Sequence, residues 1–458
     1  MTSAPVTPVI EELATYIAGA NAHPLPDAVT EKTKHHLLDT LAAMVSGTTL
    51  LPGQRAVAYA ATRGGVEEAS VVGTSILTTV EYAALANGML AHSDETDDSH
   101  APSQTHPGCG IVSAALALAE RDRRGGEALL RAIALGYDVG TRFTMCLDAL
   151  AFREEGHATH SFGPTFGAAA AAASLIGVDR RQALHVLSYA GQQASGVGAW
   201  IGDLEHVEKS FDFGGMPARN GVTAAAFVGA GFTATDDIFA GPRNFFQAYG
   251  HPGRTITPGE LVRGLGSTFE VMNTNIKRWT VGSPIQAPLD SLLELIRTHH
   301  ITADDVANVE VRVAHTGATT TDDKKMPDIS MQQMCAVMLL DGIVTFDSAH
   351  DEARMHDPAA VAMRGRIHLF GDDELQRRLP SRQGIVEITL NDGRVVRHHT
   401  EAVRGTDENP MTRAEVDEKA YYLMVPVLGE AKSRALCDAA WDIEAIADIR
   451  ELRPLLRP

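Results

Sequence analysis

The sequence predicts a mostly helical protein, with a large all-helical domain built from both chain ends and a smaller inserted α/β domain. Residues 1–265 carry their apolar side chains at helical spacing, whereas alternating apolar and polar residues, which indicate strands, occur only in residues 270–405. A chain of 458 residues is also long for a single core. We therefore expect three segments, residues 1–268, 269–404 and 405–458, of which the first and last form one domain.

The first segment contains several clear helical patterns. Residues 31–46 place Leu37, Leu38 and Leu41 on one face. Residues 111–120 are apolar almost all round, which indicates a buried helix, and RDRRGG then follows as a stop signal. Six consecutive alanines favour a helix that its neighbours can approach closely, beginning near Pro164. The expected helices are residues 31–46, 81–91, 111–120, 163–177 and 222–230.

The inserted segment has the signals of a small sheet. Residues 307–314 alternate like a half-buried strand, and residues 366–370 form another short candidate. Residues 384–397 contain two alternating runs around Asn391, Asp392 and Gly393, which is a strong hairpin signal. Residues 330–343 between them have the pattern of a buried helix, and residues 410–458 return to helix.

Composition excludes some classes of function. The net charge of −19 disfavours a surface for nucleic acid or anionic membranes, because such a surface needs a basic face. Neither an apolar run long enough to span a membrane nor a secretory signal is visible, so we expect a cytoplasmic protein. The four cysteines are widely spaced without a C-x-x-C motif, which disfavours a structural zinc site and indicates reduced thiols.

The stretch HSDETDDSHAPSQTHPG, residues 92–108, combines acidic residues with histidines. Such side chains bind metals, move protons, or cap helices in a solvated turn. The density of acidic groups alone favours the solvated turn, and the calcium-loop pattern is not met. The acidic residues and histidines of the stretch are His92, Asp94, Glu95, Asp97, Asp98, His100 and His106.

Three later segments also carry candidate chemistry. In residues 155–164, His157 and His160 form a weak metal-binding pattern just before a predicted helix, or simply close a loop between helices. In residues 206–221, Lys209 precedes a flexible glycine pair and favours an anion pocket, unless it is an ordinary surface charge. In residues 273–284, Lys277 and Arg278 stand beside Trp279 near the expected domain boundary, where the alternative is an exposed linker.

Taken together and in order, these motifs resemble those of the MmgE/PrpD family from about residue 8 to residue 445. The family includes 2-methylcitrate dehydratase, cis-aconitate decarboxylase and iminodisuccinate epimerase. The segments that carry the resemblance are LLDTLAAMVSG (37–47), ANGMLAHSDETDDSHAPSQTHPG (86–108), GHATHSFGPTFGAAAAAA (156–173), EKSFDFGGMPARNG (208–221), NIKRWTVGSPIQAPLD (275–290) and SMQQMCAVMLLDG (330–342).

The resemblance implies a helical domain with an inserted lid domain, a homodimer, and a site that needs neither a metal nor an organic cofactor. Glu95 and Ser99 stand where relatives have aspartate and threonine, and the lysine loops also differ in sequence, which leaves the substrate open. Carried over by motif, the candidate catalytic residues are Glu95, His106, His157, Lys209 and Lys277, and the candidate substrate-binding residues are Asp97, Ser99, His160 and Arg278.

The expected function is therefore a cofactor-independent lyase or isomerase acting next to a carboxylate of a small di- or tricarboxylate. Dehydration of a 2-methylcitrate-like substrate ranks first, followed by decarboxylation of a cis-aconitate-like substrate and by epimerisation. Two alternatives belong to other classes. One is a divalent-metal hydrolase or lyase with Asp94, Asp97, Asp98 and the histidines as ligands, and the other is a catalytically inactive scaffold that only dimerises.

Overall fold

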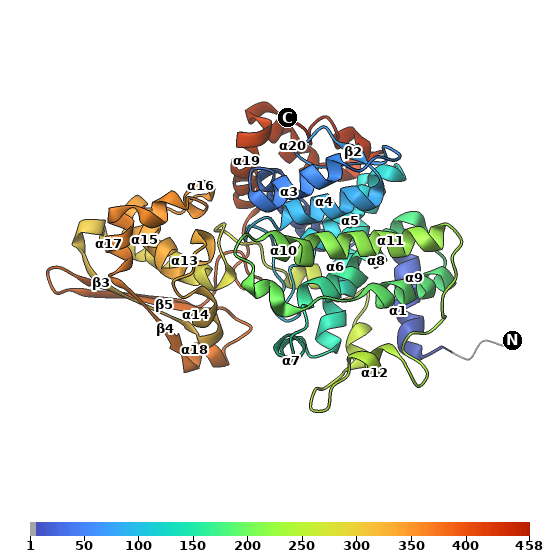
Figure 1. The fold of residues 1–458 in the computed structure, drawn as a ribbon, viewed down its shortest axis with the longest axis horizontal. Coiled ribbons are helices and arrows are strands. Elements are labelled where there is room, and N and C mark those ends of the chain that lie inside the picture. Colours follow the sequence, from blue (N-terminus) through green and yellow to red (C-terminus); the bar gives the residue numbers. More distant parts are fainter. Residues whose placement is uncertain (1–5) are drawn as a thin grey trace. The chain divides into compact units, whose positions relative to one another are not determined.

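The computed structural model describes residues 6–458, which form two compact units (Figure 1). The larger, which we call the helical unit, comprises the chain up to Ser93 together with Asp97–Thr274 and Arg413–Pro458. The smaller unit comprises Asn275–Thr412 and the short segment Asp94–Thr96. The predicted fold class, a helical body from both chain ends with an inserted α/β part, is confirmed. The domain boundaries expected at 268/269 and 404/405 stay predictions.

The helical unit is organised around α8 (Thr159–Ile176), which packs against α5 (Pro107–Arg121), α6 (Gly126–Cys146) and α11 (Met216–Gly229). Its alanines are fully buried, as the sequence predicts for a helix with close neighbours. A Cβ atom at Gly167 would lie only 2.5 Å from the Gly136 carbonyl oxygen, so the contact between α8 and α6 requires glycine. The other helices of this unit are α1 (Pro8–Gly19), α2 (Asp27–Gly47), α3 (Leu51–Ala61), α4 (Val80–Ala91), α7 (Ala149–Glu154), α9 (Arg180–Gln193), α10 (Val207–Ser210), α12 (Phe245–Tyr249), α19 (Arg413–Leu428) and α20 (Glu430–Trp441).

The C-terminal helices complete the helical unit by packing on a helix from the other end of the chain. Helices α19 and α20 contact α2, and α19 also contributes an ion pair between Lys419 Nζ and Asp39 Oδ1 at 2.6 Å. Both side chains of this pair are almost inaccessible to solvent. Burial raises the pKa of Asp39 to about 6 even though the charge of Lys419 opposes the shift. The pair therefore fixes the two chain ends to each other.

The smaller unit is built on a four-stranded sheet with the order β4-β3-β5-β6. Strands β3 (Val306–Ala314) and β4 (Ile367–Asp372) are parallel, whereas β5 (Gly384–Leu390) pairs antiparallel with β3 and forms the predicted hairpin with β6 (Val395–Thr400). All of the strands and the helix predicted in this segment are present. The helices of this unit are α13 (Ser283–His299), α14 (His315–Thr321), α15 (Met331–Asp341), α16 (Phe346–Ala349), α17 (Pro358–Arg364) and α18 (Asp373–Arg377).

Two local features differ from the sequence expectations. Helix α8 begins at Thr159 instead of near Pro164, so Pro164 lies inside it and His160 belongs to its first turn. Pro164 is the sixth residue of the helix, beyond the first turn that normally accommodates proline, so the usual position of proline at a helix start placed the predicted boundary too late. The two-residue strands β1 (Ala69–Ser70) and β2 (Leu77–Thr78) are also present, although they are too short to leave a periodic signal.

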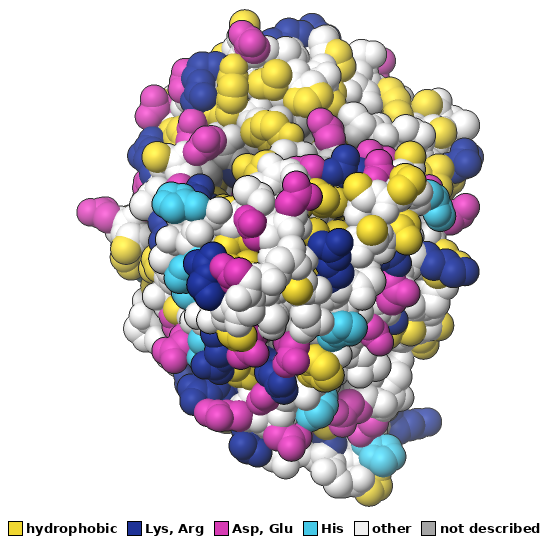
Figure 2. Space-filling model, turned by 90° about the vertical axis from the view of Figure 1, so that its left-hand side faces the viewer, with side chains coloured by type: hydrophobic (Ala, Val, Ile, Leu, Met, Phe, Trp, Pro, Cys, Tyr) yellow, Lys and Arg dark blue, Asp and Glu magenta, His cyan; other side chains and the backbone are white. Residues whose placement is uncertain are grey.

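The surface carries charges of both signs. In the view of Figure 2, Lys and Arg side chains are interspersed with Asp and Glu side chains. None of the helices within residues 6–458 is long and apolar enough to cross a membrane.

A buried polar network in the helical unit gives a first testable prediction. Asp138 accepts hydrogen bonds from the Tyr16 hydroxyl at 2.7 Å and from the Glu270 backbone N–H at 2.6 Å. Burial raises the pKa of Asp138 to about 7, although these hydrogen bonds act in the opposite direction. Between about pH 4 and about pH 7 the unfolded chain therefore releases a proton that the folded chain retains, and rising pH favours unfolding.

We expect the variant Asp138→Asn to lose this pH dependence, because the amide stays neutral in both states. The midpoint of guanidinium chloride unfolding should fall more steeply between about pH 4 and about pH 7 for the wild type than for the variant. Parallel curves for the two proteins would show that Asp138 is already ionised in the folded protein.

Candidate active site

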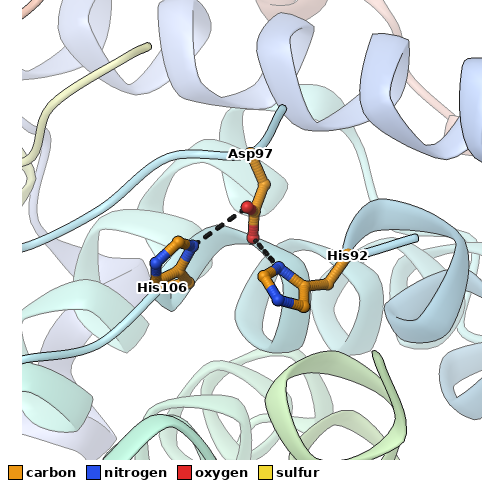
Figure 3. A group of neighbouring side chains, drawn as sticks. All are labelled: His92, Asp97 and His106. Atoms are coloured by element: carbon orange, nitrogen blue, oxygen red, sulfur yellow. Dashed lines mark hydrogen bonds and ion pairs between the residues drawn. The ribbon is translucent and has the colours of Figure 1, made fainter. Parts of the chain in front are cut away.

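The helical unit contains a carboxylate shared by two imidazoles. Asp97 Oδ1 accepts a hydrogen bond from His106 Nδ1 and Asp97 Oδ2 accepts one from His92 Nδ1, each at 2.9 Å. Figure 3 shows the carboxylate between the two rings, with one imidazole on each oxygen. The three side chains are buried, Asp97 and His92 completely. The arrangement therefore presents two histidines in equivalent bonds to one acid group.

The local chain explains why these side chains meet. Helix α4 ends directly before His92 and α5 begins directly after His106, so the loop between the two helices returns both histidines to Asp97. The next residue, Asp98, fixes the loop by accepting hydrogen bonds from the Gly108 backbone N–H at 2.9 Å, His36 Nδ1 at 2.8 Å and the Tyr137 hydroxyl at 2.5 Å. One aspartate of the stretch thus does cap the following helix. The stretch is nevertheless buried, and the interpretation as a solvated turn is wrong.

The electrostatics of Asp97 determine the protonation of both rings. Burial alone would raise the pKa of Asp97, but the charges and hydrogen bonds of His92 and His106 outweigh it and hold the pKa well below its usual value. An ionised carboxylate can only accept hydrogen bonds, so each histidine carries a proton on Nδ1. In the neutral form of each ring, Nε2 is then the basic nitrogen, as in a histidine poised for acid–base catalysis.

An aromatic side chain organises further histidines around this group. Phe213 belongs to a single turn of π-helix (Phe211–Gly215), a feature that occurs often at functional sites. Its ring stacks on His160 with centroids 3.7 Å apart and on His92 with centroids 4.2 Å apart, and it lies edge-on to His106 at 5.4 Å. Residue 206 adds a fourth imidazole, 5.1 Å from that of His92. We call His92, His106, His160 and His206 the histidine cluster.

The protonation of His160 follows from its burial. Burial lowers the pKa of His160 well below its usual value, and the nearby charge of His106 acts in the same direction. The ring is therefore neutral at physiological pH. Its centroid lies 5.2 Å from that of His106, so the structure brings these two predicted site residues together.

Lys209 approaches the same aromatic side chain from α10. Its Nζ atom lies 5.2 Å from the ring centroid of Phe213 and 5.6 Å from that of Trp200, which are cation–π distances. Trp200 and His160 also line a cavity of about 370 Å³ in the helical unit. The remaining lining residues are Arg153, Gly156, His157, Thr159, Val197, Gly198, Ala199 and Ile201. A cationic side chain thus lies close to a cavity of ligand size.

The other predicted residues of the helical unit lie apart from the Asp97 hydrogen bonds. His157 lies on the wall of this cavity and stacks on Phe152, with ring centroids 4.1 Å apart. Burial lowers the pKa of His157, and the charge of Arg254 adds to the effect. Ser99 is half-buried in the loop before α5. Of the two histidines in GHATHS, His160 therefore belongs to the histidine cluster and His157 to the cavity wall.

The smaller unit holds the second predicted lysine. Lys277 Nζ donates a hydrogen bond to the Glu95 carbonyl oxygen at 2.8 Å and lies 3.5 Å from the Glu95 carboxylate. Both residues are buried, with 3% of Lys277 and 4% of Glu95 exposed. The segment that carries Glu95 belongs by its contacts to the smaller unit, although Asp97 follows it directly in the chain. Two predicted catalytic residues, 182 positions apart in sequence, thus form one buried ion pair.

A second ion pair anchors the same segment. His350 Nε2 lies 3.1 Å from Asp94 Oδ2, and its Nδ1 donates to the Phe346 carbonyl oxygen at 2.7 Å. Burial alone would lower the pKa of His350, but the hydrogen bond and charge of Asp94 outweigh it and raise the pKa to about 9. His350 is therefore a cation at neutral pH, and it holds the segment next to Glu95 in place.

Arg278 has different surroundings from its neighbour in sequence. Its guanidinium lies 4.7 Å from the ring centroid of Trp279 and 3.6 Å from Asp290. It lines a cavity of about 360 Å³ in the smaller unit that also includes Arg404, and Lys277 is not among the lining residues. The expectation that Arg278 binds substrate together with Lys277 stays a prediction.

Several residues of these clusters were not among the predicted site residues. His92 and His206 stand inside segments that the sequence singles out, so their residue type was a usable signal. The roles of Phe213 and His350 could not be predicted from the sequence. The position of Phe213 depends on a turn of π-helix, and His350 pairs with a residue 256 positions away in the chain.

Donor atoms suited to a divalent metal are also present. One ligand atom from each of His92, Asp97 and His106 lies within 4.8 Å of the others, and nitrogen and carboxylate ligands of this kind suit zinc. The acidic groups first considered as further ligands have other partners. Asp98 accepts three hydrogen bonds, and Asp94 accepts from Thr96 and pairs with His350.

Comparisons with known proteins agree with the resemblance seen in the motifs. Profiles of the MmgE/PrpD N-terminal domain and C-terminal domain match residues 11–255 and 279–443. A cis-aconitate decarboxylase-like protein of Aspergillus oryzae is 24% identical to this chain, over 99% of the chain and 98% of its own length. The cis-aconitate decarboxylase of Homo sapiens is 24% identical over 98% and 94%, and that of Mus musculus is 22% identical over 98% and 93%.

Proposed function

The chain belongs to the MmgE/PrpD family, and we propose that it is a lyase that uses no cofactor and acts next to a carboxylate of a small di- or tricarboxylate. The observation that carries this proposal is the buried Asp97, which orients two imidazoles through Nδ1 and gives both a basic Nε2. Relatives whose names describe cis-aconitate decarboxylases support the substrate class.

The histidines supply the proton transfer. His106 donates a hydrogen bond from Nδ1 to Asp97, so Nε2 takes or returns a proton at the substrate carbon. The carboxylate stabilises the imidazolium that forms and holds the ring in one tautomer. His160 stays neutral beside it and therefore adds no positive charge that would oppose protonation of His106.

The lysines supply the positive charge. Negative charge grows on the carbon next to a carboxylate when a C–H bond or a C–COO⁻ bond breaks, and fixed cations stabilise it. We assign this role to Lys209 and Lys277. Glu95, the partner of Lys277, is the candidate acid that protonates a leaving hydroxide in a dehydration.

Two reactions fit this assignment. In a dehydration, the base takes the C–H proton, the electron pair forms the double bond, and the hydroxide leaves with a proton from the acid. In a decarboxylation, the C–C electron pair stays on the substrate, CO₂ leaves, and one proton is delivered to carbon. The sequence alone ranked dehydration of 2-methylcitrate first, whereas the names of the relatives favour decarboxylation of cis-aconitate.

A substrate panel tests the proposal. The protein is incubated in heavy water with cis-aconitate, 2-methylcitrate, citrate and iminodisuccinate, and the reactions are followed by NMR. We expect turnover of at least one compound, with loss of CO₂, loss of water or deuterium incorporation identifying the reaction. A folded protein that changes none of these compounds, and exchanges no proton next to a carboxylate, would contradict the proposed function.

A metal-dependent hydrolase or lyase is the second candidate, favoured by the donor atoms of His92, Asp97 and His106. Treatment with a chelator, followed by removal of the chelator and addition of zinc or manganese, distinguishes the cofactor-free lyase from the metal-dependent enzyme. We expect activity to survive the treatment. Activity that is lost and then restored by a metal ion would instead support the metal-dependent reaction.

The family resemblance also leads us to propose a homodimer. Sedimentation velocity at several concentrations measures the mass directly, and a monomer at all of them would contradict this proposal.

A further inference from the structure

We infer that His92 and His206 provide a second route for proton transfer in the histidine cluster, which we call the second arm. It is bound to one oxygen of Asp97, and His106 is bound to the other. This inference rests on the proposed function and adds a second histidine to its acid–base residues. His92 would carry the proton, and His206 would position its ring. Two arms suit a reaction with two proton transfers, in which one proton is taken from the substrate and one is delivered to the substrate or its leaving group.

The first observation is the equivalence of the two bonds to Asp97. His92 and His106 each donate from Nδ1 over 2.9 Å, so the carboxylate orients both rings in the same way. His92 is completely buried, and its Nε2 atom has no hydrogen-bond partner within residues 6–458. Native proteins seldom leave buried polar atoms unpaired, and a substrate atom would supply a partner for this nitrogen.

The second observation is the backbone of His206. Its φ of 61° and ψ of 9° place it in the left-handed region, which is uncommon for residues other than glycine, although histidine enters it more often than most. Six non-glycine residues within 6–458 have positive φ, and His206 alone among them is buried. Strained residues of this kind are typical of functional sites. The left-handed turn places the ring 5.1 Å from His92 and starts the helix that carries Lys209.

The surroundings of His92 suit a proton carrier. Phe213 stacks on its ring with an interplanar angle of 18°, which fixes the direction of Nε2. Within the helical unit, titratable groups that face the ring include Asp97 from the same loop, His106 before α5 and His206 before α10. His160 and Lys209 lie against the same phenyl ring from α8 and α10.

The reaction itself balances with two arms. In a dehydration, Nε2 of one histidine takes the C–H proton, the C–H electron pair becomes the double bond, and hydroxide leaves with a proton from the second imidazolium, which replaces Glu95 as the acid. In an epimerisation, one arm removes the proton and the other returns one to the opposite face. Decarboxylation needs only the delivered proton, so His106 alone suffices for it.

Three variants with the same replacement test the inference, namely His92→Asn, His206→Asn and, as a matched control, His300→Asn. Asparagine tolerates the left-handed region, so the backbone at positions 206 and 300 is preserved. His300 has a φ of 54° but is exposed in the smaller unit, outside any role assigned above. Circular dichroism and thermal unfolding establish that each variant is folded, and His92→Phe provides a second variant if His92→Asn does not fold.

The probes are 2-methylcitrate, cis-aconitate and iminodisuccinate in heavy water. For a compound that the wild type dehydrates or epimerises, we expect His92→Asn to lower kcat about 100-fold or more. One limb of its pH–kcat profile should disappear, and deuterium exchange at carbon should persist without net turnover. For His206→Asn we expect a shifted limb of the pH–kcat profile with an unchanged KM, and for His300→Asn the wild-type profile.

The outcomes separate the inference from the proposed function. If the wild type turns over one of the probes while His92→Asn keeps its kcat and pH profile, the second arm does not exist and the proposed function stands. A wild type that only decarboxylates cis-aconitate, with the same rate in His92→Asn, would overturn the second arm in the same way. If the wild type acts on none of the probes, the proposed function fails first.

Discussion

Replacement of Lys277 by methionine is expected to lower kcat/KM about 100- to 1000-fold, the range for removal of one charged group that stabilises a transition state. Lys277 is buried and directs its ammonium group to the Glu95 carbonyl and carboxylate. Methionine keeps the length and the apolar stem but removes the charge. A substrate anion would then lose one fixed cation, and Glu95 would lose the partner that orients it.

The matched control is Lys419→Met, because Lys419 also forms a buried ion pair, with Asp39 in the helical unit. Loss of one partner of a buried pair typically costs about 3–5 kcal/mol of stability. We expect Lys419→Met to lower the unfolding temperature and leave kcat/KM close to that of the wild type. Lys277→Met also breaks a buried pair and should lose a comparable amount of stability, but it should in addition lose kcat/KM about 100- to 1000-fold.

Steady-state kinetics on the substrate identified by the panel and thermal unfolding of both variants provide the comparison. Unchanged turnover in a folded Lys277→Met protein would remove Lys277 from the catalytic residues. Equal kinetic losses in the two variants would show that both pairs act through the fold alone.

Much of the fold could be predicted from the periodic spacing of apolar residues in the sequence. The alternating runs on either side of Asn391, Asp392 and Gly393 became β5 and β6, and the alanine-rich stretch became the central helix α8. These patterns are predictive because each element buries one face or all of its surface against a neighbour. The start of α8 was predicted too late because proline usually marks the first helical position, whereas Pro164 lies inside this helix.

The site was predictable where residue types cluster in sequence, and less so where the contact depends on loop geometry. Glu95, His106 and Lys277 stand in recognisable motifs. The bond between His92 and Asp97 spans five residues of irregular loop, which no periodic pattern encodes. His206 reaches His92 from a left-handed backbone conformation, and His350 pairs with Asp94 across 256 positions of the chain. Such contacts are properties of the folded chain.

The second large effect is expected for Asp97→Asn. An amide oxygen accepts one hydrogen bond, but the amide nitrogen donates, so only one of His92 and His106 keeps its Nδ1 proton facing residue 97. The other ring must turn its unprotonated nitrogen to the amide and place its proton on Nε2, where it no longer acts as a base. A catalytic histidine in the wrong tautomer cannot accept the proton, so we expect kcat to fall about 1000-fold.

The variant should also change the dependence of stability on pH. Because the histidines hold the pKa of Asp97 below its usual value, the ionised carboxylate stabilises the folded protein above the ordinary pKa of aspartate. That contribution is lost as the pH falls through the lower pKa of the folded state. Asp97→Asn has no such group, so its stability should decline less steeply in acid, which guanidinium chloride unfolding at several pH values measures.

Asp98→Asn is the control that distinguishes proton chemistry from bracing, since Asp98 is equally buried, adjacent in sequence and also bound to a histidine. Its partner His36 has a pKa that burial lowers to about 4, so that ring stays neutral at physiological pH. The amide at position 98 would keep one acceptor for three donors, and we expect a marked loss of thermal stability with a smaller loss of kcat. If Asp97 sets the protonation of reacting imidazoles, kcat must fall further in Asp97→Asn than in Asp98→Asn. Equal losses of kcat in the two variants would therefore mean that Asp97 only braces the loop.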